Sequence, residues 1–108
     1  MHIAKLTLAM AGLAALTWAA PPKPQDAGAL FRKNCAVCHG ADGHGQTAKG
    51  RKLKVKDLTS AEVQKLSDAE LTKVITQGKP PDMDGYADQL SKEEIQAMVA
   101  YVHGLGKH

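Results

Sequence analysis

The sequence predicts an all-α protein built from four or five short helices. Three observations support this class. Helix start signals recur along the chain, the apolar residues after them repeat at helical spacing, and no segment alternates between apolar and polar residues as a strand would. The start signals are unevenly spaced, which argues against a repeat protein. With 108 residues, the chain has room for one small domain.

The chain begins with a segment that precedes the predicted domain. Lys5 is followed by an uncharged run, residues 6–20, which is rich in Leu and Ala and too short to cross a bilayer comfortably. Small residues at the minus-three and minus-one positions place a cleavage site after Ala19. We therefore expect residues 1–19 to be a signal peptide and residues 20–25 a flexible leader. The alternative is an uncleaved anchor at the membrane surface.

The predicted domain covers residues 26–108. Asp26 can cap its first helix, because a carboxylate at this position can accept from the free amides of the first turn. The helix should present one apolar face to the rest of the domain. The residues on that face are Ala27, Leu30, Phe31 and Cys35.

Three later segments carry the same start signal, a capping box with a hydrophobic staple. In each, a hydroxyl residue is followed three positions later by glutamate, and apolar residues flank the pair. These segments are residues 58–63, 66–71 and 90–95. The helix that begins at residues 66–71 should end at Gly78, and the helix that begins at residues 90–95 should end at Gly104 or Gly106. Their apolar faces consist of Leu71, Val74 and Ile75 in the second helix and Ile95, Met98, Val99 and Val102 in the last.

The segment Cys35-Ala36-Val37-Cys38-His39 carries the most specific chemistry, since C-x-x-C-H is the sequence that takes up c-type haem covalently. Each thiol can form a thioether to a vinyl group of the porphyrin, and the histidine can then bind the iron. Cys35 and Cys38 are the only cysteines. A zinc ribbon would need a second pair of metal ligands, and a thioredoxin-type redox pair would need a βαβ setting. The sequence contains neither. A disulfide or two buried thiols remain as the plain alternative.

One covalently attached haem c per chain also suits the composition of the predicted domain. Its aromatic residues are only Phe31, Tyr86 and Tyr101, a poor supply for the core of so small a protein. The apolar faces of a buried macrocycle would make up the difference. We therefore expect the chain without haem to be largely unfolded.

The second axial position of the iron decides between an electron carrier and an open, reactive site. Met83 is the candidate ligand, because it lies in a loop of prolines and glycines, residues 78–86, where no helical face explains it as core. Met98 falls on the apolar stripe of the last helix and should pack there. The other histidines of the predicted domain are expected to be exposed to solvent: His44, His103 and His108.

With these residues in place, the chain resembles the class I cytochromes c, specifically the small bacterial periplasmic monohaem type. The resemblance covers most of residues 26–107. Beyond the haem motif it rests on Ala29-Leu30-Phe31, the glycine-rich residues 40–45, Gly78-Lys79 and residues 98–102. It implies a cytochrome c-like bundle around one covalently bound haem.

The resemblance also implies roles for individual residues. Cys35 and Cys38 would hold the haem thioethers, His39 would be the proximal ligand of the iron and Met83 the distal one. The first and last helices would cross, with Phe31 and Tyr101 at the crossing. Many family members have proline directly after the ligand methionine, whereas this chain has Asp84.

These features together predict a single-haem electron-transfer protein rather than an enzyme. It would shuttle one electron between periplasmic or membrane redox partners, such as a membrane oxidase or reductase complex. We expect a periplasmic monomer, compatible with transient contact with the membrane surface, and anchored there if the first segment stays uncleaved. The alternative is a haem-based gas-binding sensor or a peroxidase-like enzyme with an open sixth site.

A basic cluster follows the haem motif and is either a docking patch for an acidic partner or a solvated loop. It consists of Lys49, Arg51, Lys52, Lys54 and Lys56. Nucleic acid is not an expected partner. Loss of Lys5 with the signal would lower the formal net charge from +3 to +2, and no aromatic residues interleave with the basic ones.

Overall fold

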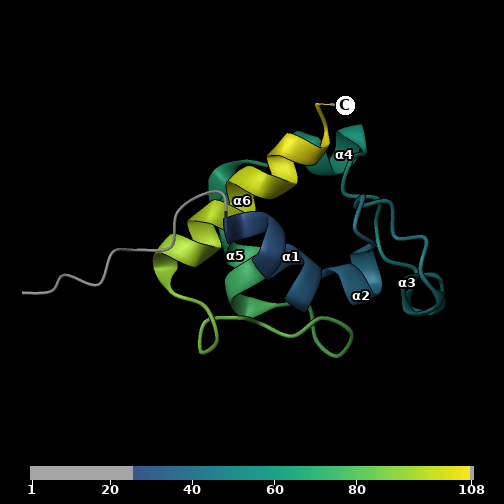
Figure 1. The fold of residues 1–108 in the computed structure, drawn as a ribbon, viewed down its shortest axis with the longest axis horizontal. Helices are drawn as coiled ribbons and strands as arrows, with labels where there is room; N and C mark the ends of the chain where they lie inside the picture. The colour runs from purple at the N-terminus through teal and green to yellow at the C-terminus, as the bar shows by residue number, and fades with distance from the viewer. Residues whose placement is uncertain (1–25, 108) are drawn as a thin grey trace, which may run out of the picture.

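The computed structural model describes residues 26–107, so the predicted signal peptide, the leader and His108 lie outside the described residues. Within this range the chain forms six helical segments and no β-strand (Figure 1). The all-α class is confirmed, whereas the expected four or five helices were too few. The helices are α1 (Ala27–Asn34), α2 (Ala36–His39), α3 (Ala48–Leu53), α4 (Ala61–Gln64), α5 (Asp68–Gln77) and α6 (Lys92–Leu105).

The predicted cap of the first helix was wrong. Asp26 has a helical backbone, with φ −76° and ψ −11°, and its side chain makes no capping hydrogen bond. A side chain reaches back to the first amides of a helix when its own backbone is extended, which is not the case here. The helix also ends one residue earlier than predicted, at Asn34, because Cys35 forms a turn that separates α1 from α2.

Helices α2 and α3 are the elements that the sequence did not predict, and α3 falls in the basic cluster, for which a solvated loop was one of the two expectations. Thr47 has an extended backbone and accepts a hydrogen bond from the amide of Gly50, which starts the helix. The helix ends after Leu53 at a left-handed residue, Lys54. A threonine cap without a glutamate partner is a weaker sequence signal than a complete capping box.

The start of α4 is shifted by one residue from its prediction. Ser60, not Thr59, is the N-cap and accepts from the amide of Val63. Thr59 is held in a separate turn, because its amide and hydroxyl both donate to the Asp57 carboxylate, at 2.8 and 2.7 Å. The glutamate that should have closed the box, Glu62, pairs with a lysine instead.

The capping boxes of α5 and α6 are confirmed in full. Ser67 accepts from the Glu70 amide while the Glu70 carboxylate accepts from the Ser67 amide. Ser91 and Glu94 form the same reciprocal pair at the start of α6. The predicted ends are also correct, since α5 stops at Gly78 and α6 at Gly106.

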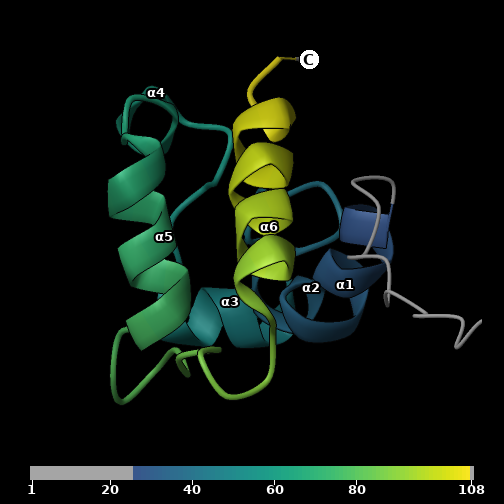
Figure 2. The same cartoon turned by 90° about the vertical axis from the view of Figure 1, so that its left-hand side faces the viewer.

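Helix α6 lies between α5 on one side and α1 on the other (Figures 1 and 2). Phe31 of α1 and Tyr101 of α6 meet where these helices contact, with ring centroids 4.9 Å apart. Two clusters of buried apolar residues follow from this arrangement. The first contains Ala27, Phe31, Leu90, Ile95 and Met98, and the second Val63, Leu71, Val99 and Val102. The apolar residues predicted to line one face of α6 thus contribute to both clusters.

Candidate functional site

The C-x-x-C-H motif consists of the turn residue Cys35, which follows α1, and the short helix α2, which contains Cys38 and His39. The Cys35 amide donates to the Phe31 carbonyl at 2.8 Å, and the His39 amide donates to the Cys35 carbonyl at 2.9 Å. Both cysteines are half-buried free thiols, so neither is used in a disulfide. The turn therefore presents two available thiols and an imidazole from one short segment, as haem attachment requires.

Burial sets the chemical state of this turn. It raises the pKa of the Cys35 thiol to about 11, with a smaller contribution from Cys38, so Cys35 is a thiol rather than a thiolate at neutral pH. A redox-active or zinc-binding cysteine needs the opposite shift. Within residues 26–107, no group of three or more His, Cys, Asp or Glu side chains is placed to hold a metal ion.

His39 carries an unpartnered polar atom into the interior. Its Nδ1 is buried and makes no hydrogen bond to any described residue. Burial lowers the pKa of His39, and the nearby backbone of Lys56 opposes that shift only in part. The ring is therefore neutral at pH 7, which is the form that binds iron. A haem would fit this residue, since binding of the iron at one ring nitrogen leaves the other to donate to a backbone carbonyl, for which Lys56 is a candidate.

The glycine-rich segment after the motif is tied back to it. The Gly45 amide donates to the His39 carbonyl at 2.7 Å, and the Thr47 hydroxyl donates to the Cys38 carbonyl at 2.9 Å. Gly50 packs so closely that a Cβ there would collide with the carbonyls of Cys38 and Gly45. The last turn of the motif is thus fixed by backbone contacts from α3.

The loop that carries Met83 is anchored beside the same turn. Lys79 and Met83 exchange two backbone hydrogen bonds, both 2.9 Å, which close the loop around its prolines. The Tyr86 hydroxyl then donates to the carbonyl of Asn34, the residue that precedes Cys35, at 3.0 Å. Burial, with smaller contributions from carboxylate and thiol groups nearby, raises the pKa of Tyr86, so this donor keeps its proton.

The two methionines of the described residues have different environments. Met98 is 1% exposed and belongs to the first buried cluster, which confirms that it is a packing residue. Met83 is half-buried and belongs to neither cluster. The contrast leaves the thioether of Met83, and not that of Met98, available to a ligand.

The prediction for the remaining histidines was correct for His44 and wrong for His103. His44 is exposed, and its Nδ1 lies 2.9 Å from the Asp57 carboxylate. His103 is half-buried, because the end of α6 packs on the turn between α4 and α5. There its Nε2 donates to the Leu66 carbonyl at 2.8 Å, and its Nδ1 lies 3.1 Å from the Asp68 carboxylate. His103 is thus a structural bridge, unavailable to iron.

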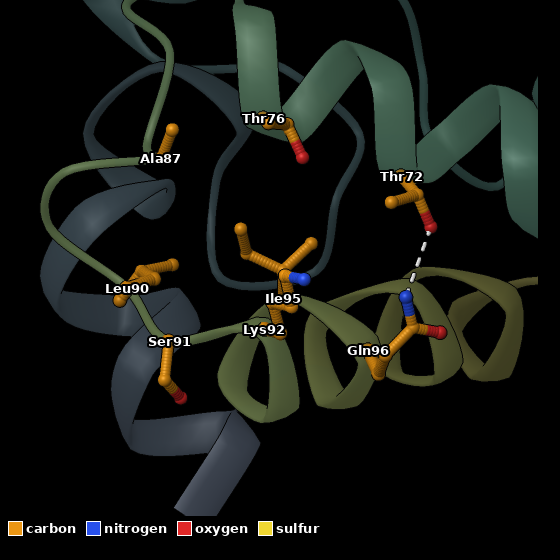
Figure 3. A pocket seen from close by; sticks show the side chains of 8 residues that line it. All are labelled: Thr72, Thr76, Ala87, Leu90, Ser91, Lys92, Ile95 and Gln96. Atoms are coloured by element: carbon orange, nitrogen blue, oxygen red, sulfur yellow. Dashed lines mark hydrogen bonds between the residues drawn. The ribbon is translucent and has the colours of Figure 1, made fainter.

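A separate pocket of about 400 Å³ lies away from the motif, between α5, the loop before α6 and the start of α6 (Figure 3). Gln96 and Thr72 join across it through a 3.3 Å hydrogen bond. It contains none of the predicted site residues. Its lining consists of Thr72, Thr76, Ala87, Leu90, Ser91, Lys92, Ile95 and Gln96.

Sequence reasoning missed several residues that support the site. Tyr86 was counted only as an aromatic, although its position three residues after Met83 made it a candidate anchor for that loop. Thr47 and Lys56 had no signal of their own, because each acts through a contact with a distant part of the chain.

In residues 26–107 no helix has the length and apolar character that a membrane span requires.

The chain is similar to known cytochromes over most of its length. Residues 22–102 match the family model described as cytochrome C oxidase, cbb3-type, subunit III. The cbb3-type cytochrome c oxidase subunit FixP of Azorhizobium caulinodans is 35% identical in an alignment of 95 residues that covers 84% of this chain and 31% of that protein. A cytochrome c6-like protein of Nostoc sp. is 36% identical over 73 residues, covering 68% of this chain and 62% of the relative.

A solved structure extends the similarity to the fold. The KustC0563 c-type cytochrome superposes with a TM-score of 0.69 at 34% identity, covering 74% of this chain and 96% of that one. The chain spans about a third of the length of FixP, so it corresponds to one part of that subunit. Haem c binding and haem-based electron transfer are properties of this family. The chain therefore belongs to the class I c-type cytochromes, in the family of cbb3-type cytochrome c oxidase subunit III.

Proposed function

We propose that the protein is a single-haem electron carrier in which Cys35 and Cys38 hold the haem through thioethers and His39 and Met83 are the two axial ligands. One observation carries the proposal. The loop with the half-buried Met83 is tied through Tyr86 to the residue directly before the haem motif. Both candidate ligands thus belong to segments that are fixed to one another.

Each residue has a distinct task in this proposal. Cys35 and Cys38 fix the haem in one orientation. His39 supplies a neutral imidazole, which is held by burial. Met83 would supply the second protein ligand of the iron and would keep water and small ligands away from it. The haem, when bound, supplies a reversible one-electron couple, and a methionine ligand favours its ferrous state.

The electron exchange needs no proton transfer and no open coordination site. The protein contributes orientation of the cofactor and exclusion of water from it. The function is therefore that of a carrier and not of an enzyme. An open sixth position, as in a gas sensor or a peroxidase-like enzyme, would be created only if Met83 stayed off the iron.

The setting of the protein is part of the proposal. We infer that the protein is exported to the periplasm, that its signal peptide is cleaved after Ala19 and that the mature protein acts there as a monomer. The FixP similarity supports a membrane oxidase of the cbb3 type as the redox partner. The chain would serve either as a diffusing carrier or as a domain docked on such a complex.

The test compares matched methionine variants of the protein produced with a cytochrome maturation system. Met83→Leu should remove the weak sulfur-to-iron band of the ferric visible spectrum, and carbon monoxide should then bind the reduced form. Met98→Leu changes a buried residue by a similar amount and should leave both readouts unchanged. Persistence of the band in Met83→Leu would contradict the ligand assignment.

A second arm tests the attachment itself. Cys35→Ala and Cys38→Ala should each retain at most one thioether, which a pyridine haemochrome spectrum detects as a shift toward a haem with a free vinyl group. If the wild-type protein purified after maturation carries no covalent haem, the proposal fails at its first step.

A further inference from the structure

Two loop segments, one before and one after α3, lie against each other beside the haem motif. We call them loop A and loop B, and they consist of residues 43–45 and residues 55–58. The Leu58 amide donates to the Gly43 carbonyl at 2.8 Å, which joins the end of loop B to the start of loop A. At the other end, a Cβ on Gly45 would lie 2.8 Å from the Val55 side chain. The loops therefore run in opposite directions, on the side of the molecule where α2 and α3 lie (Figure 1).

Both loops also contact His39, the proposed proximal ligand. In loop A, the Gly45 amide donates to the His39 carbonyl at 2.7 Å. In loop B, the backbone of Lys56 opposes the lowering of the His39 pKa by burial, as an acceptor that faces the ring does. One loop thus holds the backbone of His39 and the other faces its imidazole.

An exposed ion pair joins the two loops at their centre. His44 Nδ1 lies 2.9 Å from the Asp57 carboxylate, and the two side chains are 44% and 41% exposed. His44 directly precedes Gly45, and Asp57 directly follows Lys56. The Lys56 ammonium pairs with Glu62 at 2.7 Å, which leaves Asp57 to His44. The ion pair therefore lies one residue away from each contact with His39, where water can exchange its proton.

The charged groups that face His44 are carboxylates. The hydrogen bond and charge of Asp57, and then the charge of Asp42, raise the pKa of His44 above its ordinary 6.5. The His44 amide also donates to the Asp42 carboxylate at 3.0 Å. The helices that pack on loop A contact it through uncharged groups, the Gly50 backbone of α3 and the Leu105 side chain of α6. Loss of the His44 proton thus changes the charge of the ion pair from zero to a single negative charge.

We propose that His44 and Asp57 are positioning residues for His39, and that the charge of their ion pair makes the reduction potential of the bound haem fall as pH rises. This inference rests on the proposed function, because it concerns regulation of the same one-electron couple. While His44 is protonated, the pair is neutral. Once His44 is neutral, the Asp57 carboxylate is uncompensated, and a negative charge beside the proximal ligand stabilises the ferric state.

The electron and the proton are linked in this proposal. When the protein gives one electron to its redox partner, the added positive charge weakens proton binding at His44, which releases a fraction of a proton to water. This release accompanies the electron transfer and is not required for it. The two effects are reciprocal, so the pH dependence of the potential and the redox dependence of His44 protonation have the same size.

Two substitutions at His44 separate charge from packing. His44→Gln is neutral at every pH, so Asp57 is uncompensated throughout. His44→Lys keeps a cation beside Asp57 up to about pH 9. His103→Gln is the control, since it removes a titratable histidine whose contacts are with Leu66 and Asp68. All are produced with the cytochrome maturation system, and circular dichroism and the visible spectrum check that they fold and hold haem.

The first readout is the reduction potential, measured by spectroelectrochemical titration between about pH 5 and pH 9. At a fixed solution potential, the ratio of reduced to oxidised wild-type protein should fall by about threefold as His44 titrates. His44→Gln should keep the high-pH ratio of wild type throughout, and His44→Lys the low-pH ratio. His103→Gln should retain the wild-type profile. A shift of both His44 variants in the same direction would indicate a packing effect and overturn the proposal.

The second readout follows His44 by NMR without electron transfer. Its imidazole should bind protons about threefold more weakly in the oxidised than in the reduced protein, as reciprocity requires. Equal proton affinities in the two states would also overturn the proposal. Wild-type protein without a reversible one-electron couple would contradict the proposed function, whereas a reversible couple whose pH profile survives in His44→Gln would contradict only the role of His44 and Asp57.

Discussion

Gly50 is the residue at which the site depends most directly on an absent side chain. Its amide donates to the hydroxyl of Thr47, the residue that caps α3, and its α-carbon faces the carbonyls of Cys38 and Gly45. A single methyl group there must displace the backbone of the motif. The close approach of two backbones, rather than any side-chain contact, thus fixes α3 on the haem-attachment turn.

We expect Gly50→Ala to destabilise the protein by at least about 2 kcal/mol, since overpacking against backbone cannot be relieved by a rotamer change. Gly104 provides the control, because it lies within α6 and a Cβ there meets nothing within 4 Å. Gly104→Ala should stabilise by up to about 1 kcal/mol through helix propensity. Denaturant unfolding of the two haem-loaded variants measures both. An equally stable Gly50→Ala variant would contradict the packing of α3.

The His44–Asp57 ion pair predicts a dependence of stability on pH. The hydrogen bond and charge of Asp57 raise the pKa of His44 above its ordinary 6.5, so this contribution is complete below 6.5 and is lost as pH rises through the higher native value. The same pair, with Thr59, lowers the pKa of Asp57 from 3.8 to about 2, so that contribution is present above 3.8 and is lost toward pH 2. The ion pair is therefore intact between these limits.

His44→Gln should lower the melting temperature relative to wild type at about pH 5, and the difference should vanish at about pH 9, where His44 is neutral in both folded and unfolded chains. The effect will be small, because both side chains are exposed. Melting curves of the two proteins across this range provide the measurement. Asp57→Asn should show an additional loss that persists at pH 9, because the two Thr59 donors also lose their carboxylate partner. For His44→Gln, a difference that persists at pH 9 would indicate a packing effect instead.

At the scale of elements, the three helices with predicted capping boxes show what local sequence decides. The boxes at Ser67 and Ser91 formed because serine, glutamate and the apolar staple all lie in the same short segment. The capping box predicted at Thr59 did not form, because the Asp57 carboxylate accepts hydrogen bonds from both the amide and the hydroxyl of Thr59. Local competition for hydrogen bonds therefore moved that cap by one residue.

We predict a difference between the caps of α6 and α1. Ser91→Ala should cost about 1 kcal/mol of unfolding free energy, since it leaves the Glu94 amide without its partner. Asp26→Ala should cost less than about 0.5 kcal/mol, because the Asp26 side chain caps nothing. Chemical denaturation of both variants measures the two losses of unfolding free energy. Equal losses would mean that Asp26 does cap α1 in solution.

At the scale of the whole molecule, residues 26–107 have a small apolar core for their number. Its two clusters contain nine buried apolar residues, and Phe31 is the one aromatic residue among them. Many apolar residues that pack against the first cluster are only half-buried, including Cys35, Leu58 and Ile75. A bound macrocycle would complete their burial, so the fold and the cofactor should depend on one another.

The chain without haem should therefore be largely unfolded. When it is expressed without the maturation system, we expect a marked loss of helical circular dichroism and no cooperative melting transition, whereas the haem-loaded protein should melt cooperatively. The haem-loaded Met83→Leu variant serves as a control that keeps the thioethers. A cooperative transition in the haem-free chain would show that its two clusters suffice for folding.

Local sequence was enough to predict the helical class, the complete caps of α5 and α6, the burial of Met98 and the chemistry expected of Cys35, Cys38 and His39. Each of these depends on residues that lie within one or two turns of each other. Three other features were decided only by the tertiary structure: the anchoring of the Met83 loop by Tyr86, the burial of His103 and the placing of α3 against the motif. Each requires contact between segments far apart in the chain, and the spacing of residues along a sequence carries no information about such contacts.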